Sequence, residues 1–187
     1  MTAVHVIAGR WKRRRLEAPP GARPTSGRAR EALFSILGEA IADARVLDLY
    51  AGSGAVGLEA ASRGAPRVVL VEKRAEPLAK TIARFAPEPG RVLLLSMDAV
   101  PALRSIMERG ERFDLVFADP PYAARGEAQA LRLIPPLLAA EGMFVLQKDA
   151  GQETAAPRGL ALVDRREYGR NVFFFFRRSF DREGPRC

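Results

Sequence analysis

The sequence predicts an α/β fold: a mostly parallel sheet with helices on both faces, an antiparallel hairpin at its end and a small basic arm before it. The first observation is a set of five short segments that are almost entirely apolar, residues 45–49, 67–71, 91–95, 113–117 and 142–146. Such segments are typical of parallel strands that are buried on both faces. The second observation is that longer helix-compatible segments separate them. This alternation favours right-handed crossovers in a doubly wound sheet.

The predicted helices cover residues 55–63, 74–85, 98–109 and 126–139. The first three are followed by Gly64, Pro87 and Gly110, residue types that commonly terminate helices. A chain of 187 residues, 48% of them hydrophobic, is long enough to bury a substantial core. We therefore expect a single sheet-centred domain.

The last part of the chain departs from the alternation of strand and helix. Residues 160–168 and 171–178 flank Gly169-Arg170, a pattern that predicts an antiparallel hairpin completing the sheet. The aromatic run 173–176 could offer a platform for nucleic-acid bases, but a strand buried on both faces is the simpler interpretation.

The first part of the chain predicts a small hairpin followed by a helix. Residues 4–7 and 13–16 have strand-like patterns. Pro24-Thr25 then introduces a helix with four apolar residues on one face, Ala29, Leu33, Phe34 and Leu37.

The net charge of +8 is concentrated in the first 30 residues. They contain eight basic side chains and one acidic residue, Glu17, whereas the remaining 157 residues have a net charge of +1. A basic segment on a nearly neutral body indicates a polyanionic partner, most often nucleic acid; a solvated basic tail is the alternative. We therefore divide the chain into an arm and helix, residues 1–38, and a main domain, residues 39–187.

The scarce residue types exclude several chemistries. Cys187 is the one cysteine, which excludes an internal disulfide, a CxxC redox pair and a cysteine-rich zinc site. His5 is the one histidine and lies in a strand-like run, which argues against a Ser-His-Asp triad or a multi-histidine metal site, so we expect no bound metal. No apolar run approaches the roughly 18 residues of a membrane span, and no signal-peptide pattern is present. We expect a cytoplasmic protein without membrane contact.

A glycine-rich loop follows the first predicted strand of the main domain. Gly52, Gly54 and Gly57 match the pattern G-x-G-x-x-G, and Glu72 stands at the end of the second strand, twenty residues after Gly52. The carboxyl edge of an open α/β sheet is where ligands bind. Taken alone, the pattern fits a dinucleotide site in which the acidic residue binds ribose hydroxyls.

Three carboxylates favour a different nucleotide ligand, S-adenosylmethionine. Asp48, Glu72 and Asp98 are all expected along the same sheet edge. They would repel a pyrophosphate but attract a ligand that carries an ammonium and a sulfonium group.

The segment after the fourth strand predicts a site for an amino group on a base. Asp119 is followed by Pro120, Pro121 and Tyr122. The prolines lack backbone donors, so the Asp119 carboxylate and the Pro120 carbonyl are left as converging acceptors, and Tyr122 offers a face for stacking. A plain turn is the alternative for this segment alone.

Several segments together resemble one known family. They are VIAGRW at 6–11, RPT at 23–25 with Arg28, Arg30-Glu31 and Leu33-Phe34, LDLYAGSG at 47–54, GLEA at 57–60, SRGA at 62–65, VEK at 71–73 and FDLVFADPPY at 113–122. In these segments the chain resembles the bacterial 16S ribosomal RNA guanine-N2 methyltransferases of the small subunit. These are class I methyltransferases with a Rossmann-like sheet, and the resemblance extends from Val6 to about Phe176.

The resemblance implies transfer of a methyl group from S-adenosylmethionine to guanine N2 in 16S rRNA, within the small subunit, by a monomer with its catalytic site in Asp119 to Tyr122. Residues 39–187 would form the methyltransferase domain. It implies that Gly52 and Gly54 lie under the methionine part of the cofactor, Glu72 binds the ribose and Asp98 the adenine amino group, with Asp48 near the amino acid end. The full implied cofactor set is Asp48, Ala51, Gly52, Ser53, Gly54, Glu72, Lys73, Asp98 and Ala99. The implied RNA-binding set is Arg10, Trp11, Lys12, Arg13, Arg14, Arg15, Arg23, Thr25, Arg28 and Arg30.

Four positions depart from the family pattern. Arg13 stands where a glycine is usual, Tyr50 replaces a phenylalanine and Gly27 replaces a polar residue. Gln147 ends the fifth strand where we would expect an acidic residue.

Three other functions share part of this pattern. An adenine-N6 or cytosine-N4 methyltransferase acting on DNA or RNA would share the Asp-Pro-Pro-Tyr segment but not the arm motif. A nicotinamide-dependent oxidoreductase would share the glycine pattern, but the absence of a catalytic histidine from this sequence argues against it. A non-catalytic RNA-binding module would keep the arm and would not need both loops.

Overall fold

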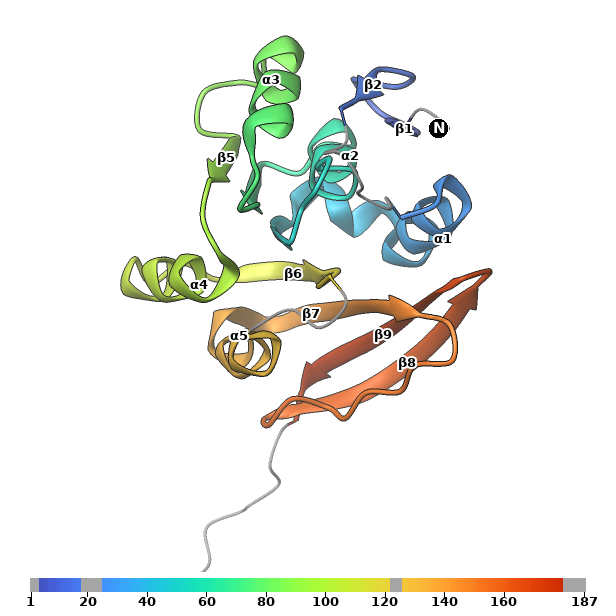
Figure 1. Cartoon of the computed structure of the whole chain (residues 1–187), viewed down its shortest axis with the longest axis vertical. Coiled ribbons are helices and arrows are strands. Elements are labelled where there is room, and N and C mark those ends of the chain that lie inside the picture. Colours follow the sequence, from blue (N-terminus) through green and yellow to red (C-terminus); the bar gives the residue numbers. More distant parts are fainter. Residues whose placement is uncertain (1–3, 18–24, 122–125, 180–187) are drawn as a thin grey trace, which may run out of the picture.

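The computed structural model describes residues 4–17, 25–121 and 126–179, and its centre is a seven-stranded sheet with the order β5-β4-β3-β6-β7-β9-β8 (Figure 1). The strands are β3 (Arg45–Leu49), β4 (Arg67–Val71), β5 (Val92–Leu95), β6 (Phe113–Ala118), β7 (Leu138–Asp149), β8 (Leu160–Tyr168) and β9 (Asn171–Arg178). Strands β3 to β7 are parallel, and β9 lies antiparallel between β7 and β8. The predicted α/β fold and its C-terminal hairpin are confirmed.

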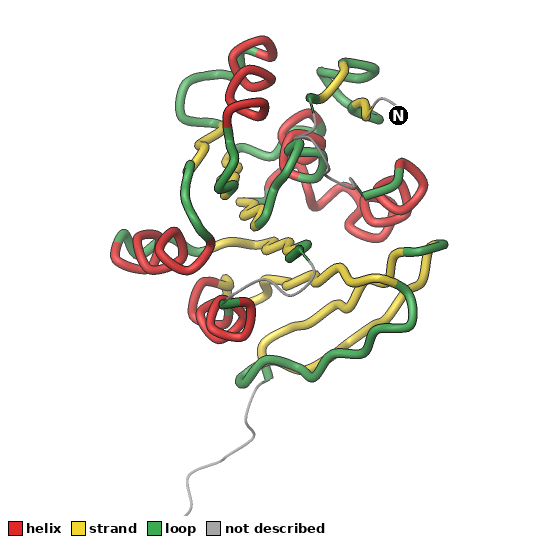
Figure 2. The backbone as a smooth tube through the Cα atoms, viewed as in Figure 1, coloured by secondary structure: helices red, strands yellow, loops and turns green. Residues whose placement is uncertain are grey.

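Helices cover both faces of the sheet (Figure 2). The helical segments of the described ranges are α1 (Gly27–Leu37), η1 (Gly38–Asp43), α2 (Gly57–Ser62), α3 (Glu76–Phe85), α4 (Ala99–Glu108), α5 (Glu127–Leu133) and η2 (Pro135–Leu137). The first four pack on one face, and α4, α5 and η2 pack on the other. The first two crossovers, through α2 and α3, therefore lie on one face and the next two, through α4 and α5, lie on the other, as in a doubly wound sheet.

The prediction of one helix over residues 126–139 is wrong. Helix α5 ends at Leu133, a single 3-10 turn follows, and β7 begins at Leu138, four residues before the predicted strand. Pro135 and Pro136 cause the break, because neither has a backbone N–H to donate and each ring crowds the preceding turn. The sheet gains a longer β7, whose Leu138 pairs with Phe113 before a register shift.

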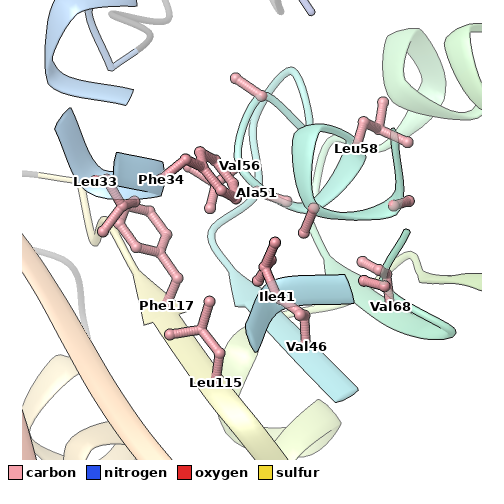
Figure 3. Close-up of a cluster of buried hydrophobic side chains, with 14 of the residues drawn as sticks. Leu33, Phe34, Ile41, Val46, Ala51, Val56, Leu58, Val68, Leu115 and Phe117 are labelled. Atoms are coloured by element: carbon pink, nitrogen blue, oxygen red, sulfur yellow. The ribbon is translucent and has the colours of Figure 1, made fainter. Parts of the chain in front are cut away.

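Apolar side chains alternate between the two faces along each central strand. On β3, Val46 belongs to the cluster under α1 and α2, whereas its neighbour Leu47 belongs to the cluster under α4. Figure 3 shows the first cluster, in which Leu33 and Phe34 from α1 lie beside Phe117 on β6. The aromatic run Phe173–Phe176 is buried on both faces of β9, as predicted.

The predicted N-terminal hairpin is present but short, with β1 (Val4–His5) antiparallel to β2 (Arg15–Leu16). It packs against the same cluster as α2 through Val6, Trp11 and Leu16. The Trp11 ring lies 5.2 Å from the Phe85 ring at the end of α3, measured between centroids. The arm and the sheet therefore share one hydrophobic core.

Candidate functional site

The loops that carry the predicted site residues leave the same edge of the sheet. Leu49 of β3 is paired in register with Val71 of β4 on one side and Ala118 of β6 on the other. Each loop is bonded to its neighbour just beyond the strands: Ala51 donates its N–H to the Val71 carbonyl at 3.0 Å, and Asp119 donates to the Leu49 carbonyl at 3.4 Å. The glycine-rich loop, Glu72 and Asp119 are thus brought together.

Gly52 and Gly54 of the glycine-rich loop have different structural roles. A Cβ on Gly54 would lie 2.6 Å from Cδ1 of Leu78 on α3, so a larger residue there would have to displace that buried side chain. A Cβ on Gly52 would meet no heavy atom closer than the Tyr50 carbonyl oxygen at 3.9 Å. Both residues have positive φ angles, 55° for Gly52 and 72° for Gly54. Gly52 therefore presents bare backbone to open space, where a ligand can approach closely.

The Glu72 carboxylate holds the loop in place. One oxygen accepts the N–H of Gly52 and the other accepts the N–H of Arg74, both at 2.9 Å. Glu72 remains partly exposed, and each carboxylate oxygen can accept a second hydrogen bond. The same group can shape the glycine loop and bind a ligand hydroxyl.

The outer end of the candidate site carries a pair of exposed charges. Lys73 and Asp98 form an ion pair at 3.1 Å, with 70% and 61% of their side chains exposed, so this contact can open at little cost. Asp98 directly precedes α4, and the next residue, Ala99, is buried.

Asp48 lies beneath the loop rather than on its surface. The carboxylate is buried and accepts the N–H of Gly57, the first residue of α2, at 2.8 Å. Burial raises the pKa of Asp48 to about 7, and the nearby charges of Asp119 and Glu72 act in the same direction. Asp48 supports the glycine-rich loop from below, and Ser53 of that loop is also buried.

Asp119 stands directly after β6, in the segment predicted to receive the base. Its Oδ2 accepts a hydrogen bond from Nε2 of Gln147 at 2.9 Å. Burial and, to a smaller extent, the charge of Asp149 raise the pKa of Asp119 to about 7, and the Gln147 hydrogen bond opposes the rise. Pro120 is buried and Pro121 is exposed, while Tyr122 lies outside the described residues.

Gln147 stood out in the sequence but had no assigned role, and the structure places it beside Asp119. Its side chain is 5% exposed at the end of β7, and its Oε1 accepts a hydrogen bond from the Thr25 hydroxyl at 2.9 Å. The available signal was a single polar residue closing an apolar strand, Phe144-Val-Leu-Gln147.

The structure separates the predicted RNA-binding residues into exposed and buried sets. Lys12, Arg13, Arg15 and Arg28 are exposed, and no acidic partner is found for their side chains among residues 4–17, 25–121 and 126–179. Arg10 pairs with Glu88, and Arg14 lies over the Phe85 ring, 5.3 Å from its centroid. Arg23 lies outside the described ranges.

Three members of the predicted RNA-binding set are buried, and we correct that assignment. Trp11 and Arg30 are 3% exposed and Thr25 is 6% exposed. The Arg30 guanidinium donates to the backbone carbonyls of His5 and Ala55, joining the arm to the glycine-rich loop. A side chain held inside the protein cannot reach a phosphate, so these three residues leave the RNA-binding set.

A family model described as "Conserved hypothetical protein 95" matches residues 4–177 of this chain. The chain is 39% identical over 124 residues to "Ribosomal RNA small subunit methyltransferase D" of Escherichia coli K12. That match covers 64% of this chain and 60% of the relative, less than two thirds of its length. The match to YlbH of Bacillus subtilis is longer, with 32% identity over 89% of this chain and 94% of the relative.

Two solved structures have a closely similar fold. The structure of yhhF from Escherichia coli has a TM-score of 0.80 and 30% identity, covering 95% of this chain and 98% of the other. The hypothetical protein TTHA0928 of Thermus thermophilus has a TM-score of 0.78 and 35% identity, covering 92% and 98%. Both alignments therefore extend over nearly the whole of this chain and of the other.

In the described ranges, we find no helix both long and apolar enough to cross a membrane, and no cluster of three or more side chains suited to a metal ion.

Proposed function

This chain belongs to the family described as conserved hypothetical protein 95, and on that premise we propose that it transfers the methyl group of S-adenosylmethionine to the exocyclic N2 of a guanine in 16S ribosomal RNA. The observation that carries the proposal is the position of Asp119 beside the glycine-rich loop, through the pairing of β3 with β6. That pairing brings the Asp119 carboxylate, which can accept from an amino group, next to the glycine-rich loop that would bind the nucleotide part of the cofactor.

The residues of the loop fit the cofactor. The bare backbone at Gly52 leaves room for the methionine part, Glu72 can accept from the ribose hydroxyls and Asp98 from the adenine amino group. When bound, S-adenosylmethionine supplies an electrophilic methyl carbon whose bond to sulfur breaks as its bond to nitrogen forms. The nearby carboxylates favour a ligand that carries positive charge.

Asp119 and the Pro120 carbonyl prepare the guanine amino group for reaction. Each accepts one amino hydrogen, which orients the nitrogen lone pair and stabilises the positive charge that develops on N2. The proton that N2 loses passes to the Asp119 carboxylate. Its raised pKa of about 7 makes it a better proton acceptor than an ordinary carboxylate while leaving a large fraction ionised near neutral pH.

We assign the exposed basic residues of the arm to the phosphates that flank the target guanine. Lys12, Arg13, Arg15 and Arg28 have no acidic partner in the described ranges and are available for this role. A guanine stacked in a helix could not reach Asp119, so the substrate is a flipped or exposed nucleotide. We place residues 1–38 with RNA contact and residues 39–187 with catalysis, although both parts share one core.

A relative named as a small-subunit rRNA methyltransferase supports the choice of rRNA. We propose that the protein acts as a monomer, and we place it in the cytoplasm with the small ribosomal subunit. The Asp119 segment alone would equally suit the amino group of adenine or cytosine. The arm motif favours rRNA guanine.

The test uses small ribosomal subunits that lack the modification. They are incubated with the protein and S-adenosylmethionine labelled in the methyl group, and the rRNA is digested to nucleosides. We expect the label in N2-methylguanosine. Label in N6-methyladenosine or N4-methylcytidine, or transfer to DNA at an equal rate, would replace the proposed substrate. No transfer to any nucleic acid would overturn the proposal.

A further inference from the structure

The Thr25–Gln147–Asp119 chain of hydrogen bonds connects the start of α1 to the candidate catalytic carboxylate. The Thr25 hydroxyl donates to Oε1 of Gln147 at 2.9 Å, and Nε2 of Gln147 donates to Oδ2 of Asp119 at 2.9 Å. Thr25 and Gln147 are 6% and 5% exposed. Water therefore competes little with either bond.

The orientation of the Gln147 amide follows from its partners. An ionised Asp119 can only accept, so the NH2 end of the amide must face it, and the carbonyl end must face the Thr25 hydroxyl. Nε2 also lies 3.4 Å from Oδ1 of Asn171, which accepts its second hydrogen. Thr25 and Asn171 together hold the amide in this one orientation.

We propose that Gln147 is a positioning residue that holds one oxygen of Asp119 in place and leaves the other for the substrate amino group, and that Thr25 fixes the orientation of Gln147. This inference rests on the proposed function. Within the described residues, Oδ1 of Asp119 receives no hydrogen bond from a side chain. The arrangement explains a glutamine where an acidic residue was expected: a second carboxylate would repel Asp119, whereas an amide donates to it.

The charges around Asp119 make this donor important. Asp149 raises the pKa of Asp119, Lys148 lowers it, and Asp48 lies near enough on β3 for the two carboxylates to influence each other. Among these side chains around Asp119, Gln147 is the neutral one that donates a hydrogen bond to it. Without it, Asp119 would take up a proton at a higher pH and lose its capacity to accept from the amino group.

The experiment compares Gln147→Met with the wild type in the complete protein. Methionine has a similar length and no donor, so the cavity stays filled. Gln129→Met, at an exposed position on α5, is the matched control. For each protein, the rate of methyl transfer with saturating rRNA and cofactor is measured from pH 5.5 to 9, and the Asp119 carboxyl is titrated by carbon NMR.

We expect Gln147→Met to lower kcat at pH 7 by at least about 10-fold and to move the acid limb of the profile to higher pH, with cofactor affinity within about 2-fold. The NMR titration should show an Asp119 pKa higher by at least about half a unit. Thr25→Val should produce a smaller change in the same direction. Thr25→Ser keeps the hydroxyl and should have the pH profile of the wild type.

The two readouts separate this inference from the proposed function. An unchanged Asp119 titration and an unchanged acid limb in Gln147→Met would overturn the positioning role while leaving methyl transfer intact. A shifted titration in a protein that transfers no methyl group would uphold the hydrogen-bond chain and overturn the proposed function. A loss of rate equal in Gln147→Met and Gln129→Met would also count against the positioning role.

Discussion

The Glu59 carboxylate, fully buried in α2, accepts the backbone N–H of Ile7 at 2.6 Å and so fastens the arm to the helix that follows the glycine-rich loop. Its second oxygen accepts the N–H of Ala8 at 3.0 Å and Nε of Arg63 at 2.8 Å. A carboxylate suits this position because all of its neighbours donate. An amide would turn an NH2 group toward backbone N–H groups or toward the guanidinium.

We therefore expect Glu59→Gln to destabilise the protein by about 1 to 3 kcal/mol, the cost of leaving buried donors without an acceptor. The measurement is unfolding in denaturant, together with the rate of proteolysis within the arm. Glu31→Gln, at an exposed position on α1, is the control and should change the free energy of unfolding by less than about 0.5 kcal/mol. Equal stability of the two variants would show that the arm is held by its apolar contacts alone.

The backbone at Arg13 predicts a stabilising substitution. Arg13 has a φ angle of 67°, a left-handed conformation that costs a non-glycine residue about 1 kcal/mol. Its N–H donates to the Val6 carbonyl at 2.9 Å, which holds the turn in this conformation. Arg13→Gly should raise the free energy of unfolding relative to Arg13→Ala by about 1 kcal/mol. Both variants lose the same charge, so a difference in thermal unfolding between them reports the backbone alone. Alanine equal to or better than glycine would contradict this explanation.

The central strands could be predicted from the sequence because their signals are local. Residues 68–71 form an unbroken apolar run after Arg67, and β4 has the predicted bounds 67–71. The positions of Glu72 and Asp119 could be predicted for a related reason: each ends a recognisable strand, and parallel strands place their ends together.

The remaining features depend on contacts between distant parts of the chain. The role of Gln147 requires Thr25, which lies 122 positions away, and β7 beside β6. The burial of Trp11 and Arg30 likewise depends on α2 and α3, and the abundance of basic residues around them favoured an exposed interface. The predicted helix over residues 126–139 was too long, because its apolar spacing was given more weight than Pro135, which ends helices.

The raised pKa of Asp48 predicts that the free energy of unfolding decreases as the pH rises. Its pKa is about 7 in the folded protein, above the ordinary value of 3.8, so the folded state binds a proton that the unfolded state has lost between these two values. The free energy of unfolding should therefore fall from about pH 4 to about pH 7. Asp48→Asn keeps an acceptor for the Gly57 N–H and removes the charge, so the fall should become smaller. The free energy of unfolding of both proteins, determined in denaturant at pH 5 and pH 8, measures this change. A pH dependence identical to that of the wild type would show that Asp48 is not its source.

Asp119 and Glu72 should affect different kinetic constants. Asp119→Ala should reduce kcat by at least about 100-fold with cofactor affinity within a few fold, because the lost contact acts on the transition state. Glu72→Ala should weaken S-adenosylmethionine binding by about 1 to 3 kcal/mol, since it removes both the ligand acceptor and the acceptor for the Gly52 N–H. Single-turnover rates and calorimetric titration of the cofactor distinguish the two. Wild-type turnover by Asp119→Ala would rule out its proposed role.

The final prediction concerns the exposed basic residues of the arm. Lys12, Arg13 and Arg15 are exposed without an acidic partner in the described ranges, whereas Arg14 donates to the Phe85 carbonyl and packs over its ring. If the first three neutralise phosphates, replacing all of them with alanine should weaken RNA binding and reduce the slope of log K against log salt by about 2 to 3 units.

The control is a triple alanine variant of Arg104, Arg109 and Arg112, which are exposed on α4 and in the turn before β6. It removes the same total charge away from the arm, so a general effect of net charge would appear in both variants. Phosphate contacts carry no base information, so the arm variant should lose affinity for specific and unrelated RNA alike. Cofactor affinity should stay unchanged, because the three arm side chains are exposed and Arg30, which donates to the Ala55 carbonyl of the glycine-rich loop, is retained. Binding measured at several salt concentrations decides the matter: equal slopes for the arm variant and the wild type would mean that these cations are solvated and that RNA binds another surface.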